Sequence, residues 1–250
     1  MKKVVLLGDS ITQGLGSKQI NFSNKLGSLL GRDYEVCNCA LTGTTVDYPL
    51  NLLAENKMPD FDVALILYGN VDAQIRPNRE GVVFSRIPER YQQNGMLMPR
   101  PFYSKSKKKK VFQLVDNRMR SIFSELIRMI DGTEQWVPLS DFENKYELLI
   151  DKLSKSGNAK IICVSTVYID DDLFRGSEAE YIKYNESIRN ISTKKGIGYL
   201  DIYTPLKLKV EREGWSSCFN ADHFHPNGLG YNMMAELISD AILTNNEVLS

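Results

Sequence analysis

The chain has 250 residues, of which 42% are hydrophobic and 25% are charged, as is usual for soluble globular proteins. This length allows one domain with a sizeable core. Lysine plus arginine and aspartate plus glutamate both total 31, so no net charge favours a nucleic acid or an anionic membrane as partner.

No segment has the pattern of a membrane span or an export signal. Two lysines follow Met1, but only five apolar residues separate them from Asp9, too few for a signal-peptide core. No apolar run approaches the ~18 residues of a transmembrane helix. We therefore expect a cytoplasmic protein without a membrane span and without a nucleic-acid partner.

Short apolar segments alternate with helical patterns along the chain. The predicted strands are Lys3–Leu7, Tyr34–Asn38, Val63–Tyr68, Lys160–Val164 and Gly198–Asp201. The predicted helices are Phe22–Leu30, Pro49–Glu55, Asp141–Ser156, Glu178–Lys195 and Gly228–Thr244. Because this alternation is typical of a parallel sheet covered by helices, we predict one α/β domain over residues 1–250. It is a three-layer α/β/α sandwich whose five-stranded parallel sheet has the flavodoxin-like order 2-1-3-4-5.

One stretch, from Gln74 to about Ser140, is too long for an ordinary connection between a strand and a helix. It contains the lysine run Lys105–Lys110 and an amphipathic pattern over Val111–Ile130. We interpret residues 74–140 as an insertion near the active site. For the lysines, a solvated helix approach or loop tip is favoured over a nucleic-acid or lipid contact. For the apolar stripe, core packing is favoured over a lid on the substrate.

The four cysteines do not indicate a metal site. Cys37 and Cys39 point to one face of a predicted strand, which leaves a metal pair possible. No CxxC spacing or nearby histidine supports that pair, so we expect reduced thiols in or near the core and no bound metal.

A serine stands where the first predicted strand ends. Gly8-Asp9-Ser10-Ile11-Thr12 follows the apolar run Val4–Leu7, so the Ser10 hydroxyl would lie at the carboxyl end of the sheet. Open α/β folds place their chemistry there. An N-cap role would also explain a serine at this place, but the nucleophile interpretation is favoured because a base and its partner occur elsewhere in the chain.

That base and partner occur near the C-terminus. In Asp222-His223-Phe224-His225-Pro226 a carboxylate precedes a histidine by three residues. A serine hydroxyl needs a base to become a nucleophile at neutral pH, and the base needs a group that orients it. The chain has only two histidines, His223 and His225, so one of them is the candidate base.

Together with two further segments, these motifs resemble the SGNH/GDSL hydrolases. The segment Asn38–Thr45 follows the second predicted strand, and Tyr68-Gly69-Asn70-Val71-Asp72 follows the third. The resemblance implies that Ser10 is the nucleophile, that His225, which is followed by proline, is the base, and that Asp222 orients it. His223 is then a bystander.

The resemblance also implies an oxyanion hole with backbone donors at Ser10 and Gly43. The family motif G-x-N-D would place a third donor, an asparagine, at position 71, where this chain has Val71. Either Asn70 replaces that donor or the donor is absent, and we favour the second alternative. Asp9 and Asp72 are interpreted as turn-holding residues. Other polar side chains that could contact substrate are Thr12, Thr42, Thr44, Thr45 and Tyr68.

The resemblance therefore implies a serine esterase that needs no metal or other cofactor. We expect it to cleave a small acyl group, such as acetate, from a small-molecule or carbohydrate ester through an acyl-serine intermediate. Two alternatives stay open. One is an acyltransferase that uses the same serine, and the other is a degenerate member that binds a glycan or a protein without catalysis.

Overall fold

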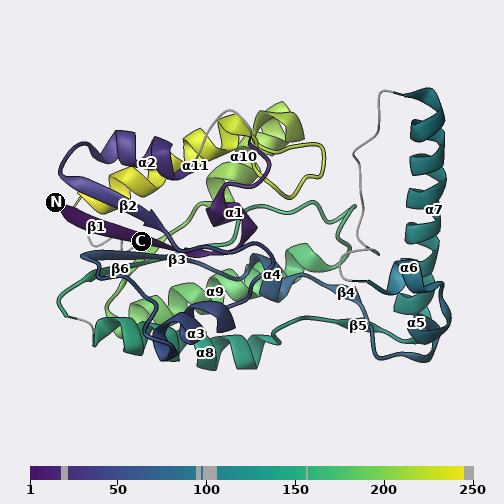
Figure 1. Ribbon diagram of the computed structural model, residues 1–250, viewed down its shortest axis with the longest axis horizontal. Coiled ribbons are helices and arrows are strands. Elements are labelled where there is room, and N and C mark those ends of the chain that lie inside the picture. The colour runs from purple at the N-terminus through teal and green to yellow at the C-terminus, as the bar shows by residue number, and fades with distance from the viewer. Residues whose placement is uncertain (18–21, 94–96, 98–105, 156, 245–250) are drawn as a thin grey trace.

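The fold was analysed in a computed structural model of the chain (Figure 1). The structure describes residues 1–17, 22–93, 97, 106–155 and 157–244. In the described part, the termini of the elements agree with the predicted strands and long helices to within a few residues.

Five parallel strands form the central sheet, in the order β2-β1-β3-β6-β7. They are β1 (Lys2–Gly8), β2 (Tyr34–Asn38), β3 (Val63–Leu67), β6 (Lys160–Val164) and β7 (Gly198–Leu200). β1 pairs on one side with β2 and on the other with β3, with Val4 opposite Val36 and Val63. Every residue of β3 is buried. This agrees with its uninterrupted apolar sequence, which is typical of a strand covered on both faces. Counted within this sheet, the order is the predicted 2-1-3-4-5.

Helices cover both faces of the sheet (Figure 1). On one face lie α2 (Phe22–Leu30), α10 (Tyr203–Glu213) and α11 (Gly228–Leu243). On the other lie α3 (Asp47–Ala54), α8 (Leu139–Ser154) and α9 (Ser177–Lys195). This confirms the three-layer α/β/α sandwich. Neither α10 nor the 3-10 turn η1 (Trp215–Ser217) that follows it was predicted from the sequence.

Short helical turns follow two of the central strands. α1 (Ser10–Gln13) begins two residues after β1, and α4 (Asn70–Ala73) begins three residues after β3. Because neighbouring parallel strands end at the same edge of a sheet, both turns stand at its carboxyl edge. Asn70 is thus the first residue of a helical turn at this edge.

The stretch 74–140 leaves this edge and builds a separate layer (Figure 1). Its strands β4 (Arg76–Pro77) and β5 (Thr133–Glu134) pair antiparallel, and between them lie α5 (Val82–Arg86), α6 (Glu89–Gln92) and α7 (Lys107–Ile130). A small apolar cluster holds this layer together; it consists of Phe84, Ile87, Tyr91 and Ile127.

Only part of the apolar stripe on α7 packs as expected. Met119 and Phe123 contact the small cluster, whereas Val115, Ile122 and Ile130 are exposed. Lys107–Lys110 form the exposed first turn of α7, and Lys105 lies outside the described residues. The interpretation of the whole stripe as core is therefore wrong for these exposed residues, because α7 stands away from the sheet (Figure 1) and its Glu125 and Arg128 meet the main body through polar contacts with Arg175.

The cysteines are free thiols. Cys163 and Cys218 are buried, and the Sγ atoms of Cys37 and Cys39 lie 3.9 Å apart. Within the described ranges, no group of three or more metal-ligating side chains occurs. None of the described helices is both long and apolar enough to cross a membrane.

Candidate active site

Ser10 is the first residue of α1 and is held from both sides of the turn. Asp9 is the N-cap, and its Oδ1 accepts a hydrogen bond of 2.9 Å from the Ile11 amide. The side chain of Ser10 is nearly buried, with 4% of the residue exposed. Gly14 ends the turn with φ of 88°, a conformation that favours glycine. The serine is therefore fixed at the edge of the sheet rather than carried on a loose loop.

His225 lies on the loop that leads into α11. A bridge between Phe219 and Pro226 closes this loop, and the Asn220 amide donates to the His225 carbonyl at 3.0 Å. Asn227 caps α11 by accepting from the amides of Leu229 and Gly230. The loop is thus tied to a long helix immediately after the histidine.

A chain of hydrogen bonds joins the serine, the histidine and the aspartate. Ser10 Oγ lies 3.0 Å from Nε2 of His225, and Nδ1 of His225 lies 2.8 Å from Oδ2 of Asp222. The second carboxylate oxygen of Asp222 accepts from the amides of Phe224 and His225. The fold brings these three side chains together although 212 residues separate Ser10 from Asp222 in the chain.

The carboxylate of Asp222 is suited to orient an imidazole. Burial opposes its ionisation, but the hydrogen bonds from the His225 ring and from two backbone amides outweigh burial and lower the pKa of Asp222. An ionised Asp222 accepts a hydrogen bond from Nδ1–H of His225 and leaves Nε2 to act on the serine hydroxyl.

Gly16 allows the segment after α1 to approach this histidine. Its φ is 97°, and a Cβ at this position would lie 3.0 Å from the Cβ of His225 and 2.6 Å from the side chain of Asn220. A larger residue here would therefore crowd His225 and Asn220, in a backbone conformation that favours glycine.

Gly43 lies in the open loop between β2 and α3. Its φ is 73°, and no atom lies within 4 Å of the position of a Cβ. The neighbouring Thr42 donates from its backbone amide to the side chain of Gln13, which ends α1. This contact ties the Gly43 loop to the turn that carries Ser10.

The side chain of Asn70 is buried, and both its oxygen and its nitrogen form hydrogen bonds within the protein. Its Oδ1 accepts from the Val167 amide at 2.9 Å, and its Nδ2 donates to Oδ2 of Asp9 at 3.3 Å. Asn70 therefore joins the α4 turn to the Asp9 N-cap and to the segment after β6. These contacts favour a tethering role for Asn70.

Two buried carboxylates hold the turns at this edge of the sheet, as expected for Asp9 and Asp72. Asp72 accepts from the amides of Val46 and Gly69 at 2.9 and 3.0 Å. Burial raises the pKa of Asp9 to about 6 and that of Asp72 to about 7.

His223 takes part in a second histidine–aspartate pair that the sequence did not suggest. Its Nδ1 lies 2.6 Å from Oδ2 of Asp170, and its ring stacks on Trp215 at 4.7 Å between centroids. Trp215 stacks in turn on Tyr168, at 4.9 Å. His223 has φ of 51°, unusual for a residue with a Cβ. No local pattern links Asp170 or Trp215 to His223, so the sequence offered no signal for this stack.

Two of the polar residues considered as substrate contacts are fully buried. Thr12 and Tyr68 both have 0% exposure, and the Tyr68 hydroxyl donates to the Gly8 carbonyl at 2.9 Å. For these two the expectation is wrong, because they pack beneath the turn and not on its outer side. Thr42 and Thr44 are exposed, and Thr45 is half-buried.

Solved structures share this fold. An acetylxylan esterase from Geobacillus stearothermophilus, in a catalytic mutant, superposes with a TM-score of 0.63 at 15% identity, covering 100% of this chain and 97% of the other. A lipase/acylhydrolase from Enterococcus faecalis gives 0.60 at 18% identity, with 97% and 95% covered. An alpha/beta hydrolase from the metagenome of Lake Arreo gives 0.59 at 16% identity, with 98% and 97% covered.

Sequence comparison assigns the family. Curated protein sequences gave no match to this chain. Residues 6–233, however, match the model of the GDSL-like lipase/acylhydrolase family. This match includes the segment of Ser10 and the segment of Asp222 and His225. The chain therefore belongs to the GDSL-like lipase/acylhydrolase family of carboxylic ester hydrolases.

Proposed function

We propose that this protein hydrolyses a small acyl ester, such as an acetate ester of a carbohydrate, through an acyl intermediate on Ser10. The observation that supports the mechanism is the chain of hydrogen bonds from Ser10 Oγ through the His225 ring to Asp222, at 3.0 and 2.8 Å. The family supports ester hydrolysis, and a fold shared with an acetylxylan esterase motivates the acetyl group.

In the first half of the proposed reaction, Ser10 Oγ attacks the ester carbonyl while Nε2 of His225 takes the hydroxyl proton. The tetrahedral intermediate collapses, His225 gives this proton to the leaving alcohol, and the acyl group stays on Ser10. Asp222 holds the imidazole in the tautomer that accepts at Nε2. We assign stabilisation of the oxyanion to the backbone amides of Ser10 and Gly43.

In the second half, water attacks the acyl-serine and His225 takes a proton from that water. The carboxylic acid leaves and Ser10 recovers its proton from His225.

We further propose that the insertion 74–140 borders the substrate. It departs from the carboxyl edge of the sheet next to Asn70 and extends beyond this edge (Figure 1).

Two measurements test the proposal. A fluorophosphonate reacts only with an activated serine, so it should label the wild-type protein and fail to label Ser10→Ala. Nitrophenyl esters of two to twelve carbons, together with acetylated sugars, then measure acyl preference, and we expect kcat/KM to be highest for acetate. Absence of labelling in the wild type would contradict the mechanism, and a maximum at long chains would contradict the acetyl assignment. Transfer of acetate to an added sugar in place of water would indicate an acyltransferase.

A further inference from the structure

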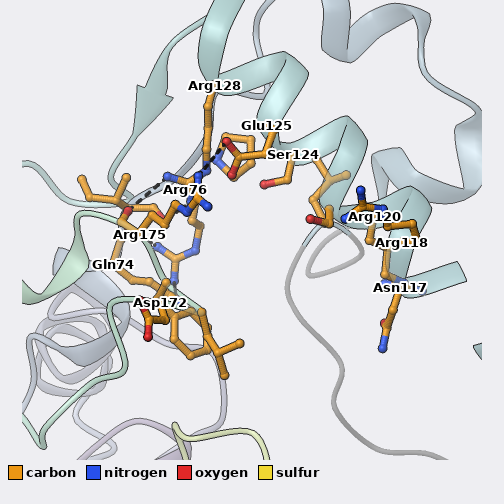
Figure 2. Close-up of a pocket in the computed structure, with 16 residues that line it drawn as sticks. Gln74, Arg76, Asn117, Arg118, Arg120, Ser124, Glu125, Arg128, Asp172 and Arg175 are labelled. Carbon is orange, nitrogen blue, oxygen red and sulfur yellow. Dashed lines mark hydrogen bonds and ion pairs between the residues drawn. The ribbon is translucent and has the colours of Figure 1, made fainter. Parts of the chain in front are cut away.

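A cavity of about 440 Å³ lies between α7 and the main body of the protein (Figure 2). Its walls come from residues 74–77 around β4, residues 117–128 of α7, residues 172–175 before α9, and Leu97. This volume falls in the range of small-molecule pockets. The cavity combines the insertion with the α/β/α body of the chain, and neither part forms it alone.

Arginines dominate the polar lining of this cavity. The arginines are Arg76, Arg118, Arg120, Arg128 and Arg175. In Figure 2, Arg76, Arg128 and Arg175 lie together on one side, and Arg118 and Arg120 lie further along α7. The only carboxylates among the lining residues that the structure describes are Glu125 and Asp172. The lining therefore carries an excess of positive charge.

Ion pairs neutralise two of these arginines. Arg175 pairs with Glu125 at 3.2 Å, and Arg120 pairs with Asp116 at 2.7 Å. Arg76, Arg118 and Arg128 form no ion pair with any described carboxylate. Arg128 donates to the backbone carbonyls of Ile75 and Arg175, contacts that satisfy hydrogen bonds without neutralising its charge.

Arg76 is the strongest indication of an anionic ligand, because it is a buried cation with no described carboxylate within ion-pairing distance, although Asp72 and Glu134 act on it from further away. It is 7% exposed, and its guanidinium lies 4.0 Å over the ring of Trp136. It donates to the carbonyls of Val71 and Gln74 and to the Gln74 side chain, while its Nε has no partner in the described part of the chain. Burial lowers its pKa to about 10. Buried charges are normally paired, and a bound anion would supply the missing partner.

Packed residues connect the cavity to the proposed catalytic residues. Phe174 lines the cavity and packs on Phe224 at 5.6 Å between ring centroids. The Phe224 ring lies 4.9 Å from that of His225. On the other side, Arg76 holds the carbonyl of Val71, next to Asn70. Two packed aromatic rings, Phe174 and Phe224, therefore link the lining of the cavity to the ring of His225.

We propose that this cavity binds the anionic group, a carboxylate or a phosphate, of the ester substrate, so that the enzyme acts on acylated acidic sugars in preference to neutral ones. Guanidinium groups can donate two hydrogen bonds at once to the oxygens of a planar carboxylate or a tetrahedral phosphate. This proposal rests on the esterase function proposed for Ser10. It adds that the alcohol part of the ester carries an anionic group.

The test compares acetylated glucuronic acid and acetylated glucose 6-phosphate with acetylated glucose at low salt. The variants are Arg118→Gln, which removes an exposed charge on α7, and Arg128→Gln. The control is Arg32→Gln, which removes another exposed arginine, from the loop before β2 at the other end of the strands. We expect the wild type to prefer the anionic substrates about 10-fold or more in kcat/KM, as charge-assisted hydrogen bonds imply. Each cavity variant should lower that preference at least several-fold, and the control should retain it.

Direct binding separates this inference from the esterase function. Ser10→Ala should bind glucuronic acid or glucose 6-phosphate by calorimetry more tightly than glucose, and adding Arg118→Gln should weaken this binding. The relative strengths of the two acids distinguish a carboxylate from a phosphate ligand. Equal binding of glucose and both acids, or equal kcat/KM for all three esters, would overturn the inference while the esterase function stands.

Failure of the wild type to hydrolyse nitrophenyl acetate or any acetyl sugar would instead contradict the esterase function. If Arg128→Gln does not fold, Arg118→Gln alone decides the outcome, because its exposed side chain carries no packing role.

Discussion

Replacing Asn70 by alanine distinguishes a tethering residue from an oxyanion donor. Asn70 is fully buried and makes two hydrogen bonds, to the Val167 amide at 2.9 Å and to Asp9 at 3.3 Å. Losing a buried partner costs about 1–3 kcal/mol for each group left unsatisfied, so Asn70→Ala should lower the free energy of unfolding by about 3 kcal/mol. If Asn70 supplied an oxyanion donor, turnover would slow by a factor of roughly 10²–10³. We expect turnover to slow by less than about 10-fold, since the side chain is already occupied by Val167 and Asp9.

Asn185 provides a matched control for this variant. It is also buried, and it makes two hydrogen bonds to Thr166, the residue before Val167, without contacting Asp9. Asn185→Ala should therefore cost similar stability. The assays are urea unfolding and the kinetics of nitrophenyl acetate hydrolysis at a temperature where both variants are folded. If Asn70→Ala alone slowed turnover by about 100-fold or more, with KM and unfolding unchanged, the tethering role would be refuted.

Three further expectations concern the catalytic residues and the buried carboxylates. Ser10→Ala should abolish hydrolysis of nitrophenyl acetate while changing the free energy of unfolding by no more than about 1 kcal/mol, because it removes one hydrogen bond; equal activity in variant and wild type would end the serine mechanism. His225→Ala should be nearly as damaging in the same assay and His223→Ala much milder, since His223 pairs with Asp170 and not with Ser10, and the reverse order would exchange their roles. Finally, Asp9 and Asp72 have pKa values of about 6 and about 7 in the folded state, above the ordinary aspartate value, so the folded state binds their protons more tightly than the unfolded state does. Stability should therefore fall by about 4 kcal/mol between about pH 5 and 8 in urea unfolding, and a rise over this interval would contradict that assignment.

The sequence alone determined the central sheet and the candidate triad. Strands such as Val63–Leu67 are short, uninterrupted apolar runs. Such a run indicates a strand that is buried on both faces, as the strands of a parallel sheet are. The residues of the candidate triad were identifiable because the Ser10 segment and the Asp222–His225 segment are short local motifs that resemble those of the SGNH/GDSL hydrolases.

Contacts between distant segments were decided only by the tertiary structure. The pairing of His223 with Asp170, the hydrogen bonds of Asn70 to Asp9 and Val167, and the arginine cavity each join segments far apart in the chain. Periodicity reports which face of an element is apolar, but not which element will cover it. For this reason the stripe on α7 was expected to be core although Val115, Ile122, Leu126 and Ile130 are exposed. Arg76 likewise gave no sign in the sequence that it would be buried with no described carboxylate within ion-pairing distance.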